Sequence, residues 1–224
     1  MSEFLNPKLT SPFYFIRKEI FAAASMFGEY VKGGRLLDFG CGSKPYKSLL
    51  KADEYIGLDY ENPGHPHDEE QIDIFYDGGK LPFKDGEFDY VLCTEVFEHL
   101  FDLDEKLVEF NRVLKMNGYM FVTCPFVWNE HEIPYDHARY TQFALNDKFK
   151  KSGFEVVQSK KGGSFWQTYT QIFFLYFSRK DEKYKTNKIG PVKKTIIFMV
   201  NLSGKVINKL LPNNDSLYLS NIYV

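Results

Sequence analysis

An apolar segment that runs into two closely spaced glycines constrains this chain more than any other feature. The segment is LLDFGCGS, residues 36–43, and it places Gly40 and Gly42 directly after a predicted strand. The next apolar run ends at Asp59, nineteen residues after Gly40. Glycines at such a turn let backbone N–H groups approach a ligand closely, and an acidic residue at the end of the second strand accepts hydrogen bonds from ribose hydroxyls. The pattern therefore predicts a nucleoside-binding α/β fold.

The residues around this turn restrict which nucleoside compound fits. A dinucleotide site needs a third glycine three residues after Gly42, to make room for pyrophosphate, and this chain has Pro45 there. Asp38, inside the first strand, would also repel a pyrophosphate, and it suits a ligand that carries positive charge. S-adenosylmethionine has both an amino group and a sulfonium, so these residues favour it over NAD or FAD.

Four motifs resemble, in order and spacing, those of class I S-adenosylmethionine-dependent methyltransferases: LLDFGCGSKPY, YIGLDY, LPFKDGEFDYVLCTEVFEHL and RVLKMNGYMFVTCPF. The resemblance covers residues 34–160 and implies a cofactor site of six residues. These are Asp38 at the methionine end, Gly40 and Gly42 in the loop, Asp59 at the ribose, Asp73 at the adenine, and Glu95. For Asp73, the alternative is a purely structural role at the end of a strand. The sequence departs from the family at Lys44, where many members carry a further glycine.

Alternating strands and helices predict a Rossmann-like parallel sheet that is wound on both faces. The resemblance implies seven strands, six parallel and one antiparallel beside the sixth. We expect an N-terminal helical cap over residues 1–33, a cofactor-binding domain over 34–160, and a helical insertion with the last strand over 161–224. Apolar residues at helical spacing place the inserted helices within 164–211. The alternative is that QIFFLYF, residues 171–177, is itself the seventh strand.

Local signals predict where several elements begin and end. Ser11 followed by Pro12 is typical of a helix start, and Thr141 is expected to cap another helix. A further helix is expected over 104–115, and the sixth strand over 154–158.

Acidic and imidazole side chains follow the fourth predicted strand. In the string EVFEH, Glu95, Glu98 and His99 stand at i, i+3 and i+4, so a helix would place them on one face. Two carboxylates and an imidazole suit Mg²⁺, Mn²⁺ or Zn²⁺. The same string resembles the metal site of ubiquinone-pathway and small-RNA 2′-O-methyltransferases. The alternative is a metal-free site in which these residues pack under the cofactor.

The loop after the fifth predicted strand carries a third group of reactive residues. A sugar hydroxyl is too weakly acidic to ionise alone, so methyl transfer to it needs a base or a metal. His131 and His137 are the candidate bases, with Asp136 as an orienting partner. The alternative is that Asp136 pairs with Arg139 and only fixes the loop. The pattern HxxPxDxxRYT, residues 131–141, resembles methyltransferases encoded with bacterial surface-polysaccharide enzymes.

Together these features predict an S-adenosylmethionine-dependent O-methyltransferase that acts on a hydroxyl of a glycan or lipid-linked sugar. One alternative is an O-methyltransferase for a small aromatic or quinone-like acceptor. Another is a non-catalytic, cofactor-binding membrane adaptor. No Asn/Asp-Pro-Pro-Tyr/Phe string follows the fourth strand, which disfavours methylation of amino groups in DNA or glutamine.

Charge is distributed unevenly along the chain and bears on its partners. Residues 160–224 hold 11 basic and 3 acidic residues, a net of +8, which leaves −10 for residues 1–159 out of the total of −2. The acidic domain argues against binding to nucleic acid. The basic, apolar stretch 164–211 predicts either peripheral contact with a membrane or a homodimer. Three cysteines, an odd number, and the lack of a signal peptide predict a cytoplasmic protein, at the inner membrane face if 164–211 binds lipid.

Overall fold

The structure is a computed structural model, and it describes residues 3–60, 72–177 and 190–224. Within these residues, seven strands form one sheet in the order β3-β2-β1-β4-β5-β7-β6. The strands are β1 (Arg35–Phe39), β2 (Glu54–Tyr60), β3 (Ile74–Tyr76), β4 (Phe88–Thr94), β5 (Leu114–Pro125), β6 (Ser159–Gly162) and β7 (Ser220–Tyr223). Only β7 runs antiparallel to its neighbours, between β5 and β6. The predicted Rossmann-like sheet of six parallel strands and one antiparallel strand is confirmed.

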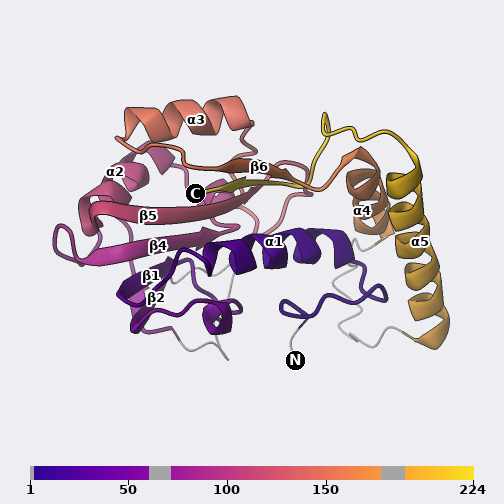
Figure 1. Cartoon of the computed structure of the whole chain (residues 1–224), viewed down its shortest axis with the longest axis horizontal. Coiled ribbons are helices and arrows are strands. Elements are labelled where there is room, and N and C mark those ends of the chain that lie inside the picture. The colour runs from indigo at the N-terminus through magenta and orange to yellow at the C-terminus, as the bar shows by residue number, and fades with distance from the viewer. Residues whose placement is uncertain (1–2, 61–71, 178–189) are drawn as a thin grey trace.

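Helices cover both faces of the sheet (Figure 1). α1 (Tyr14–Phe27) lies across one face, and α2 (Leu103–Val113) and α3 (Gln142–Lys151) cover the other. Side chains of successive β1 residues point to opposite faces of the sheet. Leu36 packs in the apolar cluster under α1, and Leu37 packs in the cluster under α2 and α3. Burial on both faces explains why the central strands are almost continuously apolar. Two short 3₁₀ turns, η1 (Lys47–Leu49) and η2 (Phe97–His99), follow β1 and β4.

Two helix starts test the capping signals in the sequence. Thr141 caps α3 as predicted, because its hydroxyl accepts a hydrogen bond from the Ala144 N–H at 3.2 Å. The start predicted at Ser11 is wrong, since α1 begins at Tyr14. The Ser11 hydroxyl accepts a hydrogen bond from the Phe13 N–H instead, so it fixes the turn that precedes the helix.

Two further boundaries differ because sheet pairing overrides the local pattern. The helix expected over 104–115 ends at Val113, where Leu114 begins to pair with Phe88 of β4. The sixth strand lies at Ser159–Gly162 rather than at 154–158, because it is these four residues that pair with β7.

Two helices, α4 (Phe165–Phe177) and α5 (Pro191–Leu210), lie between β6 and β7 and stand at one end of the sheet (Figure 1). The alternative that residues 171–177 form the seventh strand is wrong, because they are helical. α4 and α5 approach closely at Gly204, where a Cβ would lie 2.5 Å from Thr170 Oγ1. Residues 178–189 of the predicted insertion lie outside the described residues.

Candidate active site

A cavity of about 580 Å³ lies at the carboxyl ends of β1, β2 and β4. This volume is typical of sites that hold a small organic ligand, and the carboxyl edge is where parallel sheets bind ligands. The turn after β1, the end of β2, the turn after β4 and the loop after β5 all contribute to its wall. The sequence-predicted site residues on that wall are Gly40, Gly42, Asp59, Glu95, His99, His131 and His137.

The glycine turn and Asp59 come together as the sequence predicts. Gly40 has φ of +71°, and a Cβ there would lie 2.5 Å from a methyl group of Val96, so only glycine fits. The Gly42 N–H donates a hydrogen bond to the Asp59 carboxylate at 2.7 Å, and the Tyr60 N–H donates to its other oxygen at 2.8 Å. The carboxylate thus anchors the turn and borders the cavity at once.

Asp38 lies behind the cavity wall rather than on it. Its side chain is 2 % exposed, and one oxygen accepts a hydrogen bond from the Tyr55 hydroxyl at 2.5 Å. Burial raises the pKa of Asp38 to about 7, although the hydrogen bond from Tyr55 opposes the shift. The resemblance places this residue at the methionine end of the cofactor; the geometry gives it no direct access to the cavity, so its influence there is electrostatic.

Asp73 does not reach the cavity wall either. It precedes β3, where its carboxylate accepts hydrogen bonds from the Lys44 ammonium and the Gly57 N–H, both at 2.6 Å. Partial burial would raise the pKa of Asp73, but these hydrogen bonds outweigh it and the pKa lies below its usual value. These contacts are those of the structural alternative for Asp73, and the contact with adenine stays a prediction. Lys44, at the position where relatives have glycine, adopts φ of +51° and pairs with Asp73.

Glu95 lines the cavity directly after β4 in a left-handed conformation, with φ of +55°. Its N–H donates a hydrogen bond to the carbonyl of Thr123 at 2.8 Å, and its carboxylate accepts one from the Ser220 hydroxyl at 3.0 Å. Burial raises the pKa of Glu95 to about 7, although the hydrogen bond from the Ser220 hydroxyl opposes the shift. Ser220 belongs to β7, and the sequence around it carries no signal that would place it beside Glu95.

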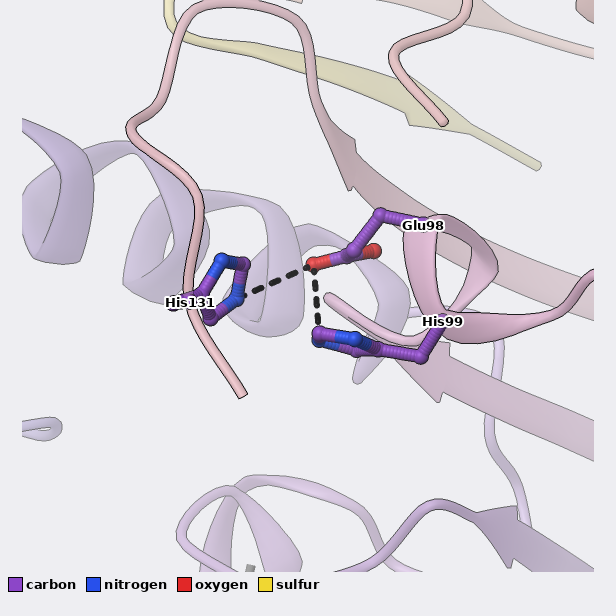
Figure 2. Close-up of side chains that lie close together, drawn as sticks. All are labelled: Glu98, His99 and His131. Carbon is purple, nitrogen blue, oxygen red and sulfur yellow. Dashed lines mark ion pairs between the residues drawn. The ribbon is translucent and has the colours of Figure 1, made fainter. Parts of the chain in front are cut away.

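The helical face predicted for Glu95, Glu98 and His99 does not form. η2 is a 3₁₀ turn of only three residues, and the left-handed Glu95 stands before it. Glu98 and His99 converge instead with His131, from the loop after β5, and the ligand atoms of the three lie within 4.8 Å of one another (Figure 2). The structure therefore brings together Glu98 and His99 of the expected metal-ligand set, and adds His131, which the sequence analysis considered only as a base.

Glu98 is fully buried within this group. Neither of its carboxylate oxygens has a hydrogen-bond partner among the described residues. Burial raises the pKa of Glu98 well above its usual range, and the nearby Glu95 adds to the shift. One oxygen lies 3.7 Å from His99 Nε2 and 3.9 Å from His131 Nε2.

Asp136 holds His131 and Arg139 together. Its carboxylate accepts hydrogen bonds from Arg139 at 2.5 and 2.7 Å and from the His131 N–H at 3.0 Å, and His131 Nδ1 lies 3.2 Å away. Burial alone would raise the pKa of Asp136, but these contacts lower it to about 2. Burial also lowers the pKa of His131, and His99 adds to that shift. Asp136 is thus both the orienting partner of His131 and the partner of Arg139.

His137 lines the same cavity without joining this network. Its ring lies against Phe101, with 5.5 Å between ring centroids. Its backbone N–H donates a hydrogen bond to the backbone carbonyl of Glu98 at 2.8 Å. The loop therefore presents two imidazoles to the cavity in different surroundings: His131 beside a carboxylate, and His137 beside an aromatic ring.

Comparison with known proteins adds a family and a fold. Residues 37–122 match the family described as methyltransferase domain. A SAM-dependent methyltransferase from Archaeoglobus fulgidus is similar in structure, with a TM-score of 0.54 and 18 % identity over 94 % of this chain and 96 % of that one. Phosphoethanolamine N-methyltransferase 2 from Haemonchus contortus, solved with S-adenosyl-L-methionine, gives a TM-score of 0.51 and 15 % identity over 99 % of this chain and 58 % of its own.

The same fold also serves another reaction. The [4+2]-cyclase SpnF gives a TM-score of 0.55 at 15 % identity over 97 % of this chain and 84 % of that one. Identities this low show the fold alone, and a shared fold does not by itself fix the reaction. Residues 37–122 are thus similar to a methyltransferase domain, and the chain as a whole has the fold of S-adenosylmethionine-dependent methyltransferases.

Proposed function

We propose that the chain transfers a methyl group from S-adenosylmethionine to a hydroxyl of a glycan or lipid-linked sugar. The observation that carries the proposal is one cavity bordered both by the glycine turn with Asp59 and by the imidazoles of His131 and His137. The first pair suits a nucleoside, and the imidazoles suit the removal of a proton from an acceptor.

The residues around the cavity fit the cofactor. Gly40 leaves space that a side chain would fill, and Asp59 offers a carboxylate to the ribose hydroxyls. Asp38 and Glu95 supply negative charge near the sulfonium and amino groups once they ionise. When bound, S-adenosylmethionine supplies the methyl group: the acceptor oxygen forms a bond to the methyl carbon while the C–S bond breaks and its electron pair stays on sulfur. The protein contributes alignment of the two reactants and a base for the hydroxyl proton.

The acceptor class rests on the loop 131–141, whose pattern resembles methyltransferases of surface-polysaccharide clusters. The cavity is also lined by Phe4, Tyr46, Phe101 and Tyr135. Such aromatic lining supports the second candidate, a small aromatic or quinone-like acceptor, because rings stack on rings. Sugars also lie well against aromatic rings, so the lining is compatible with both candidates.

Methyl-labelled cofactor separates the candidates. The protein is incubated with labelled S-adenosylmethionine and, in parallel, with lipid-linked sugars, with free glycans and with catechol or quinol compounds. We expect label in a sugar methyl ether that survives alkali. Label only in the phenolic compounds would favour the second candidate. Cofactor binding without transfer to any fraction would favour a non-catalytic adaptor.

We further propose that the third predicted part, residues 161–224, meets an anionic membrane surface through α5. One face of this helix exposes apolar residues three, four or seven positions apart, each between 47 and 76 % exposed. These are Val192, Ile196, Met199, Val206 and Leu210. The opposite face holds the buried Asn201 and Gly204. The described part of the chain contains no helix that is long and apolar enough to cross a membrane.

Charge favours lipid over a second copy of the chain as the occupant of this face. α5 carries four lysines and no acidic residue. A helix pair across a two-fold axis would bring eight like charges together, whereas anionic head groups attract each lysine by about 1 kcal/mol. Binding to a membrane would also bring a cytoplasmic enzyme to a lipid-linked acceptor.

Vesicle sedimentation tests this surface. Binding is expected to need anionic lipid, to weaken with salt, and to fall about fivefold for each lysine of α5 replaced by glutamine. Lys115, which pairs with Asp89 at the far end of the sheet, gives a matched control, Lys115→Gln. Equal partitioning to neutral and anionic vesicles, or dimers in sedimentation without lipid binding, would favour the homodimer.

A further inference from the structure

We infer that Glu98, His99 and His131 form a binding site for a divalent first-row transition ion, such as Mn²⁺, at the inner wall of the cavity. The inference deepens the proposed function, and its catalytic part rests on that function. It starts from the convergence of one carboxylate and two imidazoles from two separate segments, η2 and the loop after β5 (Figure 2).

The hydrogen bonds of the two histidines point their free nitrogens at one place. His99 Nδ1 lies 2.9 Å from the carbonyl of Tyr135, which can only accept, so Nδ1 carries the proton and Nε2 has a lone pair. His131 Nδ1 lies 3.2 Å from the Asp136 carboxylate, which assigns the same tautomer. Both Nε2 lone pairs therefore face the Glu98 carboxylate. A carbonyl or carboxylate behind a histidine is the usual support of a metal ligand.

The spacing fits a shared cation rather than hydrogen bonds within the group. The distances of 3.7 and 3.9 Å from Glu98 to the two Nε2 atoms exceed hydrogen-bond length. Two ligands that bind one ion at about 2.0–2.2 Å can lie up to about 4.4 Å apart. The three ligand atoms lie within 4.8 Å of one another, so small rotations of the imidazole rings bring all three into contact with one ion.

The buried carboxylate gives an independent reason for a cation. Glu98 is fully buried, and both of its oxygens lack a hydrogen-bond partner among the described residues. Folded proteins pair nearly all buried polar groups, and a buried charge needs a counter-charge. When Glu98 is ionised, the three groups present only acceptors to one another, and a divalent ion satisfies all of them together.

The ligand types select the ion and its use. Imidazole nitrogens suit transition ions, whereas Mg²⁺ prefers oxygen ligands, so two imidazoles and one carboxylate favour Mn²⁺, Co²⁺ or Zn²⁺. His99 and His131 line the cavity, so three protein ligands leave open positions on that side. An acceptor hydroxyl bound there becomes more acidic and passes its proton to His137, while its oxygen takes the methyl group. In this arrangement His131 is a ligand and His137 is the base.

Metal binding can be measured without any methyl acceptor. The full chain is stripped with chelator and titrated with Mn²⁺, with free Mn²⁺ followed by electron paramagnetic resonance. Co²⁺ provides a second readout, because its visible spectrum reports nitrogen ligation. We expect one ion per chain, and Glu98→Gln and His131→Ala are each expected to weaken binding at least tenfold.

Two matched variants make the test specific. His137→Ala removes an imidazole from the same loop, and Glu95→Gln removes the charge of the neighbouring buried carboxylate; both are expected to keep Mn²⁺ affinity within about threefold. Circular dichroism and thermal unfolding verify that each variant is folded. No binding at millimolar Mn²⁺, Co²⁺ or Zn²⁺, or unchanged affinity in both Glu98→Gln and His131→Ala, would overturn the inference. Methyl transfer that persists without metal binding would refute this site alone, whereas metal binding without any methyl transfer would refute the proposed function alone.

Discussion

Replacing Asp59 with alanine is expected to weaken S-adenosylmethionine binding by about 10- to 150-fold. Asp59 borders the cavity, and a hydrogen bond to a charged group contributes about 1.5–3 kcal/mol. Each 1.4 kcal/mol is tenfold in affinity, which gives the stated range. Isothermal titration calorimetry with the cofactor and with its demethylated product measures the change.

Asp59 also anchors the glycine turn, so a control must separate binding from folding. Asp53, at the amino end of β2, accepts a hydrogen bond from the Gly34 N–H at 2.7 Å, the same distance at which Asp59 holds Gly42. Asp53→Ala removes an equivalent anchor far from the cavity, at a cost of about 0.5–1.5 kcal/mol in stability. We expect it to leave cofactor affinity unchanged. Wild-type affinity in Asp59→Ala, or equal losses in the two variants, would refute the assignment of Asp59.

Three further predictions concern the turn, the buried acid and the base. Gly40→Ala should lower both the stability of the protein and its affinity for the cofactor, because a Cβ there would lie 2.5 Å from Val96. Gly79 has a similar φ but no atom near the position of a Cβ, so Gly79→Ala should lower stability alone. Thermal unfolding measures the stability, and calorimetry measures the affinity. The pKa of Asp38 in the folded chain is about 7, above its ordinary 3.8, so between these values the folded chain holds a proton that the unfolded chain releases. The free energy of unfolding should therefore fall as pH rises from 4 to 7. Denaturant titrations should show that it changes less with pH in Asp38→Asn. His137→Ala should lower kcat by about 10²–10⁴-fold with unchanged cofactor affinity, and near-normal turnover would place the base elsewhere.

The parts of the site that the sequence predicts correctly are those set by local chain geometry. Gly40 and Gly42 follow a strand whose apolar pattern is plain, and Asp59 ends the next strand in the sheet. Both positions depend only on strand ends at one edge of a parallel sheet, which strand order and direction already determine. The sequence therefore predicts that Asp59 and the turn belong to one site, but not the hydrogen bond between them.

The parts that the sequence predicts wrongly depend on contacts between distant segments. The string EVFEH has helical spacing, but the left-handed Glu95 and the three-residue turn η2 take the place of the expected helix. His131 joins Glu98 only because the loop after β5 folds back over η2, with the His137 N–H bonded to the Glu98 carbonyl. Asp73, which precedes β3, pairs with Lys44 from the turn after β1. No periodicity in the sequence reports any of these contacts.

The last strand links the inserted helices to the cavity. β7 carries the chain from α5 back into the sheet, where the Ser220 hydroxyl donates a hydrogen bond to Glu95 at 3.0 Å and the Asn221 amide donates one to the carbonyl of Tyr140 at 2.8 Å. Tyr140 ends the loop that bears His131 and His137. β7, whose four residues are all buried, thus connects α5 with the residues of the site. If α5 docks on a membrane as proposed, the mouth of the cavity has a fixed orientation to the lipid surface, and an acceptor that carries both a lipid and a sugar can present its hydroxyl while it stays in the bilayer.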